Sequence, residues 1–336
     1  MRLSVLDQSP IVSGRSPASA IRETVELARL CDSLGYARYW VSEHHNTASV
    51  AGAAPEVLLG ALAMVTQRIR LGSAGIMLPH YAALKVAEQF RVLEALAPGR
   101  IDLGLGRAPG SDPRTAQALN PDASIAAEHF PALVRDVMAW VSGAPLPDTH
   151  PFRAVQAQPL GPTAPEVWIL GSSDYGARLA AYFGLPYCFA HFFSDGRGAA
   201  EALALYRQEF RPSPAWPEPR AALCVWALAA DTAAEARRLS APREYWRIIR
   251  DRGQFVPIPT PEEAAAFPYT ELEQARIEQM RQTTIAGTGP EVVARLSALA
   301  AELGAEEIAV VTATHDPESR RRSYTLIAEE AGLLRP

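Results

Sequence analysis

Short apolar runs alternate along the chain with longer segments in which apolar residues recur every three or four positions. Short runs of this kind are typical of strands buried on both faces of a parallel sheet, whereas the longer spacing is typical of an amphipathic helix. The predicted strands cover residues 3–7, 38–42, 69–78, 100–106, 166–171, 186–192, 221–230 and 307–314.

The predicted helices follow these strands. The clearest one covers residues 289–304, where Val292, Leu296, Leu299 and Leu303 fall on one face. The others cover residues 16–35, 55–67, 82–99, about 124–142, about 174–183, about 198–210 and about 317–332. Strands that are each followed by a helix, repeated in this way around a closed sheet, predict an α/β fold of the (β/α)8 TIM-barrel type.

A doubly wound parallel sheet is the alternative fold. Such a sheet usually carries a glycine-rich fingerprint directly after its first strand. Residues 6–14, "LDQSPIVSG", do not contain that fingerprint. The TIM barrel is therefore the preferred prediction.

The chain is predicted to form a single domain over residues 1–336. It is 48% hydrophobic, which is enough to bury a large core. The length beyond a minimal barrel falls at about 107–165, after strand 4, and at about 240–287, after strand 7. No internal repeat or domain-sized linker interrupts the chain.

Composition narrows the possible partners. The formal net charge is −5, and no stretch combines clustered Lys and Arg with aromatic residues, so we do not expect a nucleic-acid partner. The cysteines Cys31, Cys188 and Cys224 lie far apart in apolar runs and are interpreted as reduced core residues. The N-terminus lacks the apolar run of a signal peptide, and no segment approaches the roughly 18 apolar residues of a membrane span. We expect a soluble, cytoplasmic protein that does not associate with membranes.

Candidate chemistry gathers where the predicted strands end. Active sites of TIM barrels lie at the carboxyl ends of the strands. Glu43, His44 and His45 follow the second strand, "GLGRAPG" the fourth, "GSSDYG" the fifth, and His191, Phe192 and Phe193 the sixth. We therefore expect these segments to meet at one mouth of the barrel.

A metal site is not expected. Adjacent residues on an extended strand point to opposite faces, so His44 and His45 do not readily bind one ion unless the chain turns there. The sequence has no H-E-x-x-H motif, and its cysteines do not pair in ligand spacing. It also has no G-x-S-x-G nucleophile elbow.

A phosphate-bearing ligand is the favoured interpretation. Ser172 and Ser173 open a helix, whose first N–H groups and dipole attract anions, and Arg107 could grip phosphate oxygens. A plain helix cap and a surface ion pair are the alternatives for these features. Ser73, Ala74 and Gly75 are unusually small for the middle of a strand, which indicates either a flat ring lying against the backbone or tight packing within the barrel.

The sequence resembles the bacterial luciferase-like flavin monooxygenases over essentially its whole length. The matching segments are "LDQSP" at 6–10, "WVSEHHN" at 40–46, "LGSAGIMLPHY" at 71–81, "VAEQFRVLEALAPGRIDLGLGRAPG" at 86–110, "VWILGSS" at 167–173 and "GTGPEV" at 287–292. The combination of 86–110 with Glu-His-His is the most specific part of this resemblance.

The resemblance implies a TIM barrel that binds reduced FMN without a covalent bond. A separate NAD(P)H:flavin reductase would supply the FMNH2, which would react with O2 to a C4a-hydroperoxide that oxidises a small organic substrate. Homodimers paired through the early helices are common in this family. Two other functions remain open: a deazaflavin F420-dependent oxidoreductase that transfers hydride, and a flavin-binding protein without turnover.

The resemblance also assigns residues. His44 is the expected catalytic acid–base group, because an imidazole is suited to proton transfer near neutral pH. The segment containing Ala74 and Gly75, where the family often has a non-proline cis peptide, is expected to touch the flavin ring. The complete expected set is Ala74, Gly75, Arg107, Ser172, Ser173 and Tyr175 for the cofactor, and Glu43, His191, Phe192 and Arg281 for the substrate pocket or a mobile lid formed by 240–287.

The resemblance leaves some points open. Asp174 would oppose a phosphate unless its side chain points away. Nothing suggests light emission, and the aromatic residues at 191–193 favour a bulkier or flatter substrate than a linear alkanal. Hydroxylation or epoxidation in natural-product metabolism, sulfonate cleavage and aldehyde oxidation are all compatible with the sequence.

Overall fold

The strands form a closed parallel barrel in the computed structural model, which describes residues 1–333. The strand order is β6-β5-β4-β3-β2-β1-β9-β7, and pairing between β6 and β7 closes the ring. The predicted TIM barrel is therefore confirmed. Residues 334–336 of the predicted domain lie outside the described residues. The barrel strands are β1 (Arg2–Asp7), β2 (Arg38–Val41), β3 (Arg70–Met77), β4 (Ile101–Gly106), β5 (Glu166–Gly171), β6 (Tyr187–Phe189), β7 (Ala221–Ala229) and β9 (Glu307–Val311).

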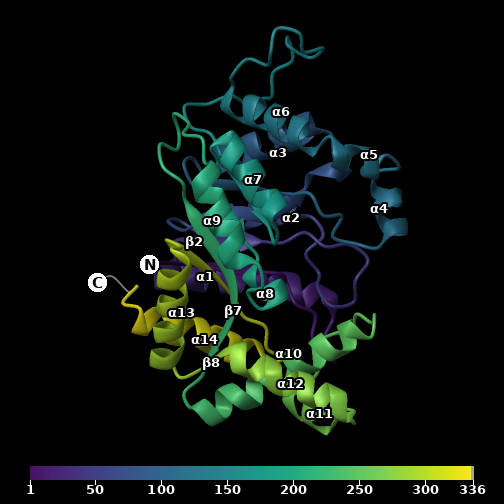
Figure 1. Cartoon of the computed structure of the whole chain (residues 1–336), viewed down its shortest axis with the longest axis vertical. Coiled ribbons are helices and arrows are strands. Elements are labelled where there is room, and N and C mark those ends of the chain that lie inside the picture. Colours follow the sequence, from purple (N-terminus) through teal and green to yellow (C-terminus); the bar gives the residue numbers. More distant parts are fainter. Residues whose placement is uncertain (334–336) are drawn as a thin grey trace.

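Helices cover the outside of the barrel (Figure 1). No helix among residues 1–333 is long and apolar enough to cross a membrane. The helices outside the barrel include α1 (Pro17–Leu34), α2 (Pro55–Val65), α3 (Ala83–Leu96), α7 (Asp174–Phe183), α9 (Ala199–Glu209), α10 (Ala233–Asp251), α13 (Gly289–Leu303) and α14 (Pro317–Glu330). A short 3-10 helix, η1 (Leu78–His80), separates β3 from α3.

The segment after β4 holds more helices than the pattern predicts. The single helix predicted at about 124–142 is wrong, because the chain forms α5 (Ala123–Glu128) and α6 (Phe130–Ser142), preceded by α4 (Pro113–Leu119). His129 separates the two helices, and Pro131 stands in the first turn of α6. Proline has no N–H to bond to the preceding turn and clashes with it, so α5 cannot continue through this position.

The segment after β7 is also helical. It contains α10, α11 (Pro261–Ala266) and α12 (Glu271–Thr283), which lie together at the lower right of Figure 1. A short ninth strand, β8 (Ile285–Gly287), extends the sheet by pairing with the last residues of β7. Its three residues are too few to produce a recognisable strand pattern in the sequence.

The predicted sixth strand is too long at its carboxyl end. β6 stops at Phe189, opposite the last residue of β5, and His191 already begins the short helix α8 (His191–Ser194). The apolar run "CFAHFF" continues past the end of the sheet, so hydrophobicity alone does not mark where the strand ends. At Phe189 the chain leaves the sheet and turns at the mouth of the barrel, whereas its other neighbour, β7, continues to Ala229.

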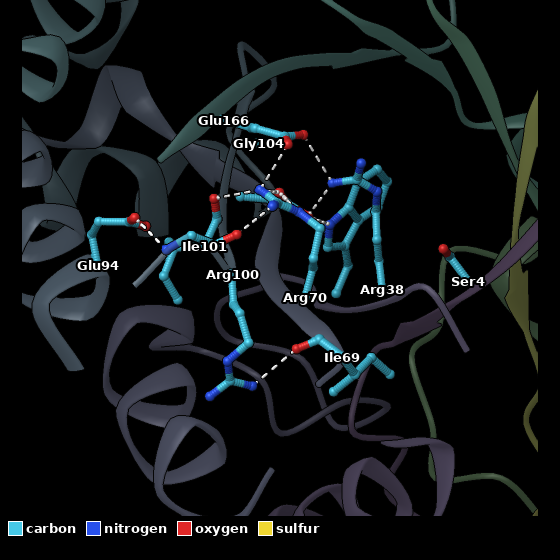
Figure 2. Close-up of polar contacts among 12 residues, drawn as sticks. Ser4, Arg38, Ile69, Arg70, Glu94, Arg100, Ile101, Gly104 and Glu166 are labelled. Carbon is cyan, nitrogen blue, oxygen red and sulfur yellow. Dashed lines mark hydrogen bonds and ion pairs between the residues drawn. The ribbon is translucent and has the colours of Figure 1, made fainter. Parts of the chain in front are cut away.

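A charged layer closes the amino-terminal end of the barrel (Figure 2). Arg38 lies 2.7 Å from Asp102, 3.1 Å from Glu166 and 3.0 Å from Glu307, and Arg70 lies 3.0 Å from Glu166. Each of these residues occupies the first or second position of its strand. Trp40 and Trp168 pack above this layer with their rings 5.2 Å apart. The interior is thus filled at this end, and any ligand must approach from the carboxyl ends of the strands.

Candidate active site

Glu43 is a fully buried carboxylate directly after β2. Its Oε1 accepts hydrogen bonds from the hydroxyl of Tyr81 (2.6 Å) and from Nε2 of His45 (2.8 Å), and its Oε2 accepts from the backbone N–H of Met77 (2.9 Å). The carboxylate therefore ties the end of β2 to the end of β3. Burial without such donors would be costly, so Glu43 is a well-supported structural anchor beside the site.

The two histidines of the Glu-His-His segment point to different partners. His45 bonds Glu43 and packs edge-on against His80, with ring centroids 6.0 Å apart. His44 instead places Nδ1 3.2 Å from the hydroxyl of Ser42. Among residues 1–333, no three His, Cys, Asp or Glu side chains cluster in a way that would bind a metal ion.

His44 is held in its neutral form. Burial lowers its pKa to about 4, the nearby Glu43 opposes this effect, and His45 adds to it. Within residues 1–333, its Nε2 has no protein hydrogen-bond partner, which leaves that nitrogen available to a ligand. At neutral pH this imidazole is unprotonated, and its unoccupied nitrogen can accept a hydrogen bond, or a proton in transit, from a bound ligand.

The small size of the residues in the middle of β3 is explained mainly by packing. The hydroxyl of Ser73 donates to the carbonyl of Gly104 (2.9 Å) across β3 and β4. A Cβ added at Gly75 would lie 2.6 Å from Cδ1 of Leu170 and 2.8 Å from the carbonyl oxygen of Gly104, so only glycine fits there. Tight packing, one of the two interpretations from the sequence, explains both positions. The peptide between Ala74 and Gly75 is cis, and the β3–β4 register shifts at this point.

Arg107 and Tyr175 form a cationic corner at the ends of β4 and β5. The guanidinium carbon of Arg107 lies 3.9 Å from the centre of the Tyr175 ring, and no carboxylate among residues 1–333 pairs with it. Ser173 is the N-cap residue that directly precedes α7, and its side chain makes no capping hydrogen bond. An unpaired cation and an uncapped helix start at one place form an anion-binding arrangement.

A cavity of about 340 Å³ opens between the ends of β3, β4 and β5, and we call it the strand-end cavity. It brings together most of the residues expected from the sequence, whereas Asp174 does not border it. The Asp174 carboxylate therefore does not face the anion-binding corner. The expected residues that border this cavity are Glu43, His44, Ala74, Gly75, Arg107, Ser172, Ser173, Tyr175 and Phe192.

A second cavity, of about 460 Å³, adjoins the first and is lined on one side by α10; we call it the α10 cavity. The sequence analysis did not identify the α10 residues, because it named only Arg281 from the expected lid at 240–287. The segment "REYWRIIR" could have indicated them, because Arg243, Arg247 and Arg250 are spaced to share one helix face. The residues that border both cavities are Gln8, His44, Gly110, Phe192 and Phe193. His44 therefore stands at the boundary between the two spaces.

The structure does not place His191 and Arg281 in either cavity. His191 begins α8, and its ring lies against Gly196, where an added Cβ would be 3.0 Å from Cδ2 of the imidazole. Arg281 makes two hydrogen bonds of 2.8 Å to Glu244, which join α12 to α10. His191 therefore does not line the pocket as expected, whereas Arg281 joins two helices within the 240–287 segment, the lid to which the resemblance assigned it.

Comparison with known proteins identifies the family. The luciferase-like monooxygenase family matches residues 1–307. The uncharacterized protein YwcH of Bacillus subtilis is 44% identical over 330 residues, covering 97% of this chain and 98% of that protein. The N-acetyl-S-alkylcysteine monooxygenase of the same organism is 36% identical over 330 residues, covering 98% of each chain.

Solved structures agree with this similarity. The crystal structure of apo-MsnO8 has a TM-score of 0.89 and 36% identity, covering 99% of this chain and 98% of that one. Two more distant structures share the fold with different flavin-type ligands. The oxygenating constituent of 3,6-diketocamphane monooxygenase of Pseudomonas putida, in complex with FMN, has a TM-score of 0.71 at 19% identity and covers 98% of this chain and 97% of that one. An F420-dependent secondary alcohol dehydrogenase with an F420-acetone adduct has a TM-score of 0.61 at 16% identity and covers 100% of this chain and 99% of that one.

Proposed function

Because the chain belongs to the luciferase-like monooxygenase family, we propose that it uses reduced FMN and O2 to oxidise a small organic substrate. The observation that carries this proposal is the strand-end cavity, which has an unpaired Arg107 at one place on its wall and a neutral His44 at another. A phosphorylated ring system needs both an anion-binding corner and an adjoining space for the ring. FMN carries both groups.

The residues present fit FMN. Its phosphate would bind between Arg107 and the start of α7, where Ser172 and Ser173 offer hydroxyl and backbone N–H donors. Its ring would lie toward Ala74, Gly75 and His44. When bound, reduced flavin supplies the electrons that activate O2.

The chain's own contribution is to position groups and to control protons. Nε2 of His44 would accept or return one proton at the boundary between flavin and substrate, while the hydroxyl of Ser42 holds Nδ1. The apolar side chains of Met77, Phe130 and Phe192 border the strand-end cavity and would exclude water from the reacting atoms. General acid–base help of this kind is typically worth about 10²–10⁴-fold in rate.

We propose three partners besides the substrate. O2 is the co-substrate, and a separate NAD(P)H:flavin reductase supplies the reduced FMN. A second copy of this chain is the third, because α2 and α3 expose apolar side chains around a shallow groove. Val57 is 71% exposed and Met64 is 72% exposed on α2, and Val92 and Leu96 continue the apolar surface on α3. Exposed apolar surface of this kind marks a contact site.

The test is reconstitution with and without each component. Purified protein is mixed with a flavin reductase, NAD(P)H, FMN and a panel of substrates, and O2 consumption and product are measured. N-acetyl-S-alkylcysteines are tested first, because one relative is named for them. We expect product only when all components are present, and one oxygen atom from ¹⁸O2 in that product. Product formed under argon would contradict the proposal.

Anaerobic titrations separate the alternative cofactors. FMN and F420 are added to separate samples of the protein, and binding is followed by fluorescence. Preferential binding of F420, with hydride transfer in the absence of O2, would identify an F420-dependent oxidoreductase. Tight FMN binding without any substrate oxidation would identify a flavin-binding protein without turnover.

A further inference from the structure

Three arginines line one wall of the α10 cavity. Arg243, Arg247 and Arg250 are spaced by four and three residues on α10, which places them on one face of the helix. Arginine carries its charge at any physiological pH. This wall is therefore the main concentration of positive charge around the cavity.

The neighbouring carboxylates do not balance these charges. Arg243 and Arg247 share a single carboxylate, Asp195, at 3.2 and 2.9 Å. Asp112 is the one carboxylate that borders the cavity, and its oxygens accept hydrogen bonds from Asn46 and from Arg114 and Thr115 at the start of α4. Asp112 is thus occupied as a helix cap and as a partner of Asn46.

Arg250 has no anionic partner among residues 1–333. In the chain from residue 1 to residue 333, no carboxylate lies within ion-pair distance of its guanidinium, which makes no hydrogen bond to another side chain or carbonyl. It lies 5.4 Å from the centre of the Trp246 ring, and burial lowers its pKa. The group is therefore partly removed from water without an opposite charge to compensate.

Two further donors at the same cavity are buried and unpaired within the described part of the chain. These are Nε of Arg247, a residue that is 4% exposed, and the hydroxyl of Ser49, a residue that is 2% exposed. Buried polar groups are nearly always hydrogen-bonded, so these two groups leave unsatisfied donors in the cavity wall. Both atoms are enclosed by neighbouring side chains, and a shift of those side chains would be needed to bring them to an anionic oxygen.

Aromatic side chains form a large part of the remaining cavity wall. Trp226 lies under Arg243, with 4.4 Å between the guanidinium carbon and the ring centre, and Trp246, Phe192 and Phe255 also border the space. A ligand that matches this surface has a charged end and an apolar body.

We propose that the substrate is an organic acid, a small molecule with a carboxylate or sulfonate at one end and an apolar, oxidisable body. Its oxyanion binds Arg250, with Arg247 and Ser49 as further donors, and its apolar body extends along the aromatic side chains toward His44. This assignment rests on the proposed function, since it names the substrate class of the same site. A guanidinium pairs well with either acid, because both present two oxygens to its parallel N–H groups.

A purely structural role accounts for two of the three arginines but not for the third. Arg247 donates to the carbonyl of Phe192 (3.0 Å), and Arg243 donates to the hydroxyl of Thr284 (2.8 Å), so both hold α10 against its neighbours. Arg250 makes no such contact. It is therefore the residue whose substitution separates ligand binding from folding.

Equilibrium binding of matched neutral and charged compounds tests the proposal without electrons or O2. Hexanoate, 3-phenylpropanoate and hexanesulfonate, each paired with its uncharged carboxamide or sulfonamide, are titrated by calorimetry into FMN-free and FMN-loaded protein. The variants are Arg250→Gln, which removes the charge, Arg250→Lys, which keeps it, and Arg237→Gln. Arg237 is an exposed arginine on the same helix that does not border the cavity, so its substitution controls for the loss of one positive charge.

We expect at least one acid to bind about 10- to 100-fold more tightly than its neutral partner, the range expected for a charge-assisted hydrogen bond. This preference should disappear in Arg250→Gln and persist in Arg250→Lys and Arg237→Gln. Circular dichroism checks that Arg250→Gln folds, and Ser49→Ala, which should weaken acid binding more than amide binding, provides a second variant. Equal binding of acids and amides, no binding of any acid, or an unchanged preference in Arg250→Gln would overturn the proposal. Failure of the proposed function would instead appear as absent FMN binding or as product formed without O2.

Discussion

Arg320, on the last helix, donates a hydrogen bond of 2.7 Å to Oδ1 of Asp7, at the end of the first strand. Both side chains are buried, and they lie 313 positions apart in the sequence. Oδ2 of Asp7 also accepts hydrogen bonds from Thr24 on α1 (2.7 Å) and Tyr39 on β2 (2.5 Å). One carboxylate thus holds α1, α14 and two strands together beside the barrel mouth.

Replacement of Asp7 with Asn should destabilise the protein strongly. The substitution leaves the buried Arg320 without its charge partner, and breaking a buried pair in this way typically costs about 3–5 kcal/mol. Urea unfolding of the variant measures the free energy of unfolding. The matched control is Asp231→Asn, which removes an exposed partner of Arg322 on the same helix and should leave the midpoint unchanged. Similar midpoints for the two variants would contradict the role assigned to Asp7.

The stability of the protein should fall in acid partly through Asp7. Burial alone would raise the pKa of this carboxyl, but Arg320 and the hydroxyl donors outweigh that effect and lower it. The folded state therefore binds this proton less readily than the unfolded chain, whose pKa is about 3.9. The stabilisation is complete above that pH and is lost as the pH falls through the lower, folded-state pKa. The free energy of unfolding, measured at pH values from 6 downward, should decrease less steeply in Asp7→Asn than in the wild type.

His44 should remain neutral well below pH 6. Its folded pKa of about 4 lies below the unfolded value of about 6.5, so the folded protein resists its protonation, and the associated stability is present above about pH 6.5 and lost as the pH falls toward 4. NMR titration of the imidazole carbons measures this pKa directly. An imidazole that titrates near 6.5 would contradict the burial of this group.

Replacement of His44 with Gln should lower turnover without removing the flavin. Glutamine retains a hydrogen-bonding side chain but cannot transfer a proton, so kcat should fall by about 10²–10⁴-fold. The dissociation constant for FMN should change little, because the phosphate corner is intact. His45→Gln, which alters the partner of Glu43 instead, is the comparison. Full activity in His44→Gln would contradict the proposal that His44 transfers a proton.

Arg107→Gln should weaken FMN binding by about 10- to 100-fold, because a charge-assisted contact to the phosphate is lost. Riboflavin has the same ring and no phosphate, so its affinity should be the same in the wild type and the variant. Fluorescence titration with both ligands measures the two affinities. An equal loss for riboflavin would show that Arg107 does not contact the phosphate.

Val57→Glu should convert the proposed homodimer into a monomer. The substitution places a charge on the exposed apolar surface of α2, and burying an unpaired carboxylate in an interface is costly. Light scattering after size-exclusion chromatography measures the mass. Leu272→Glu is the control, since Leu272 is 82% exposed on α12 and far from this surface in sequence. A monomeric wild type would contradict the dimer at once.

The barrel could be predicted from the sequence because its strands are continuous apolar runs. The end of β6 could not, because Phe192 and Phe193 continue the apolar run while the chain has already turned into α8. The same turn explains why His191 was assigned to the pocket. A run of hydrophobic residues indicates burial but does not indicate whether the burial is within a sheet or beside it.

The closeness of Arg107 and Tyr175 could be predicted because both residues come soon after the ends of neighbouring strands, which lie side by side at the mouth of the barrel. The arginines of α10 lie on a helix that follows β7. The orientation of that helix depends on its packing in the folded protein and cannot be predicted from the neighbouring residues in the sequence. At Gly75 the sequence leaves two explanations open. Its small size was compatible with a ligand or with packing, and only the closeness of Leu170 and Gly104 distinguishes the two.

The charged layer at the amino-terminal end of the barrel restricts where ligands can enter and leave. Since Arg38, Asp102 and Glu307 block that end, the proposed flavin, substrate, oxygen and product would all enter and leave at the carboxyl ends of the strands. Molecules that use the same opening cannot pass through it at the same time. The α10 cavity adjoins the strand-end cavity at this mouth, so a substrate bound there would lie next to the proposed flavin and would affect the order in which the two bind and leave.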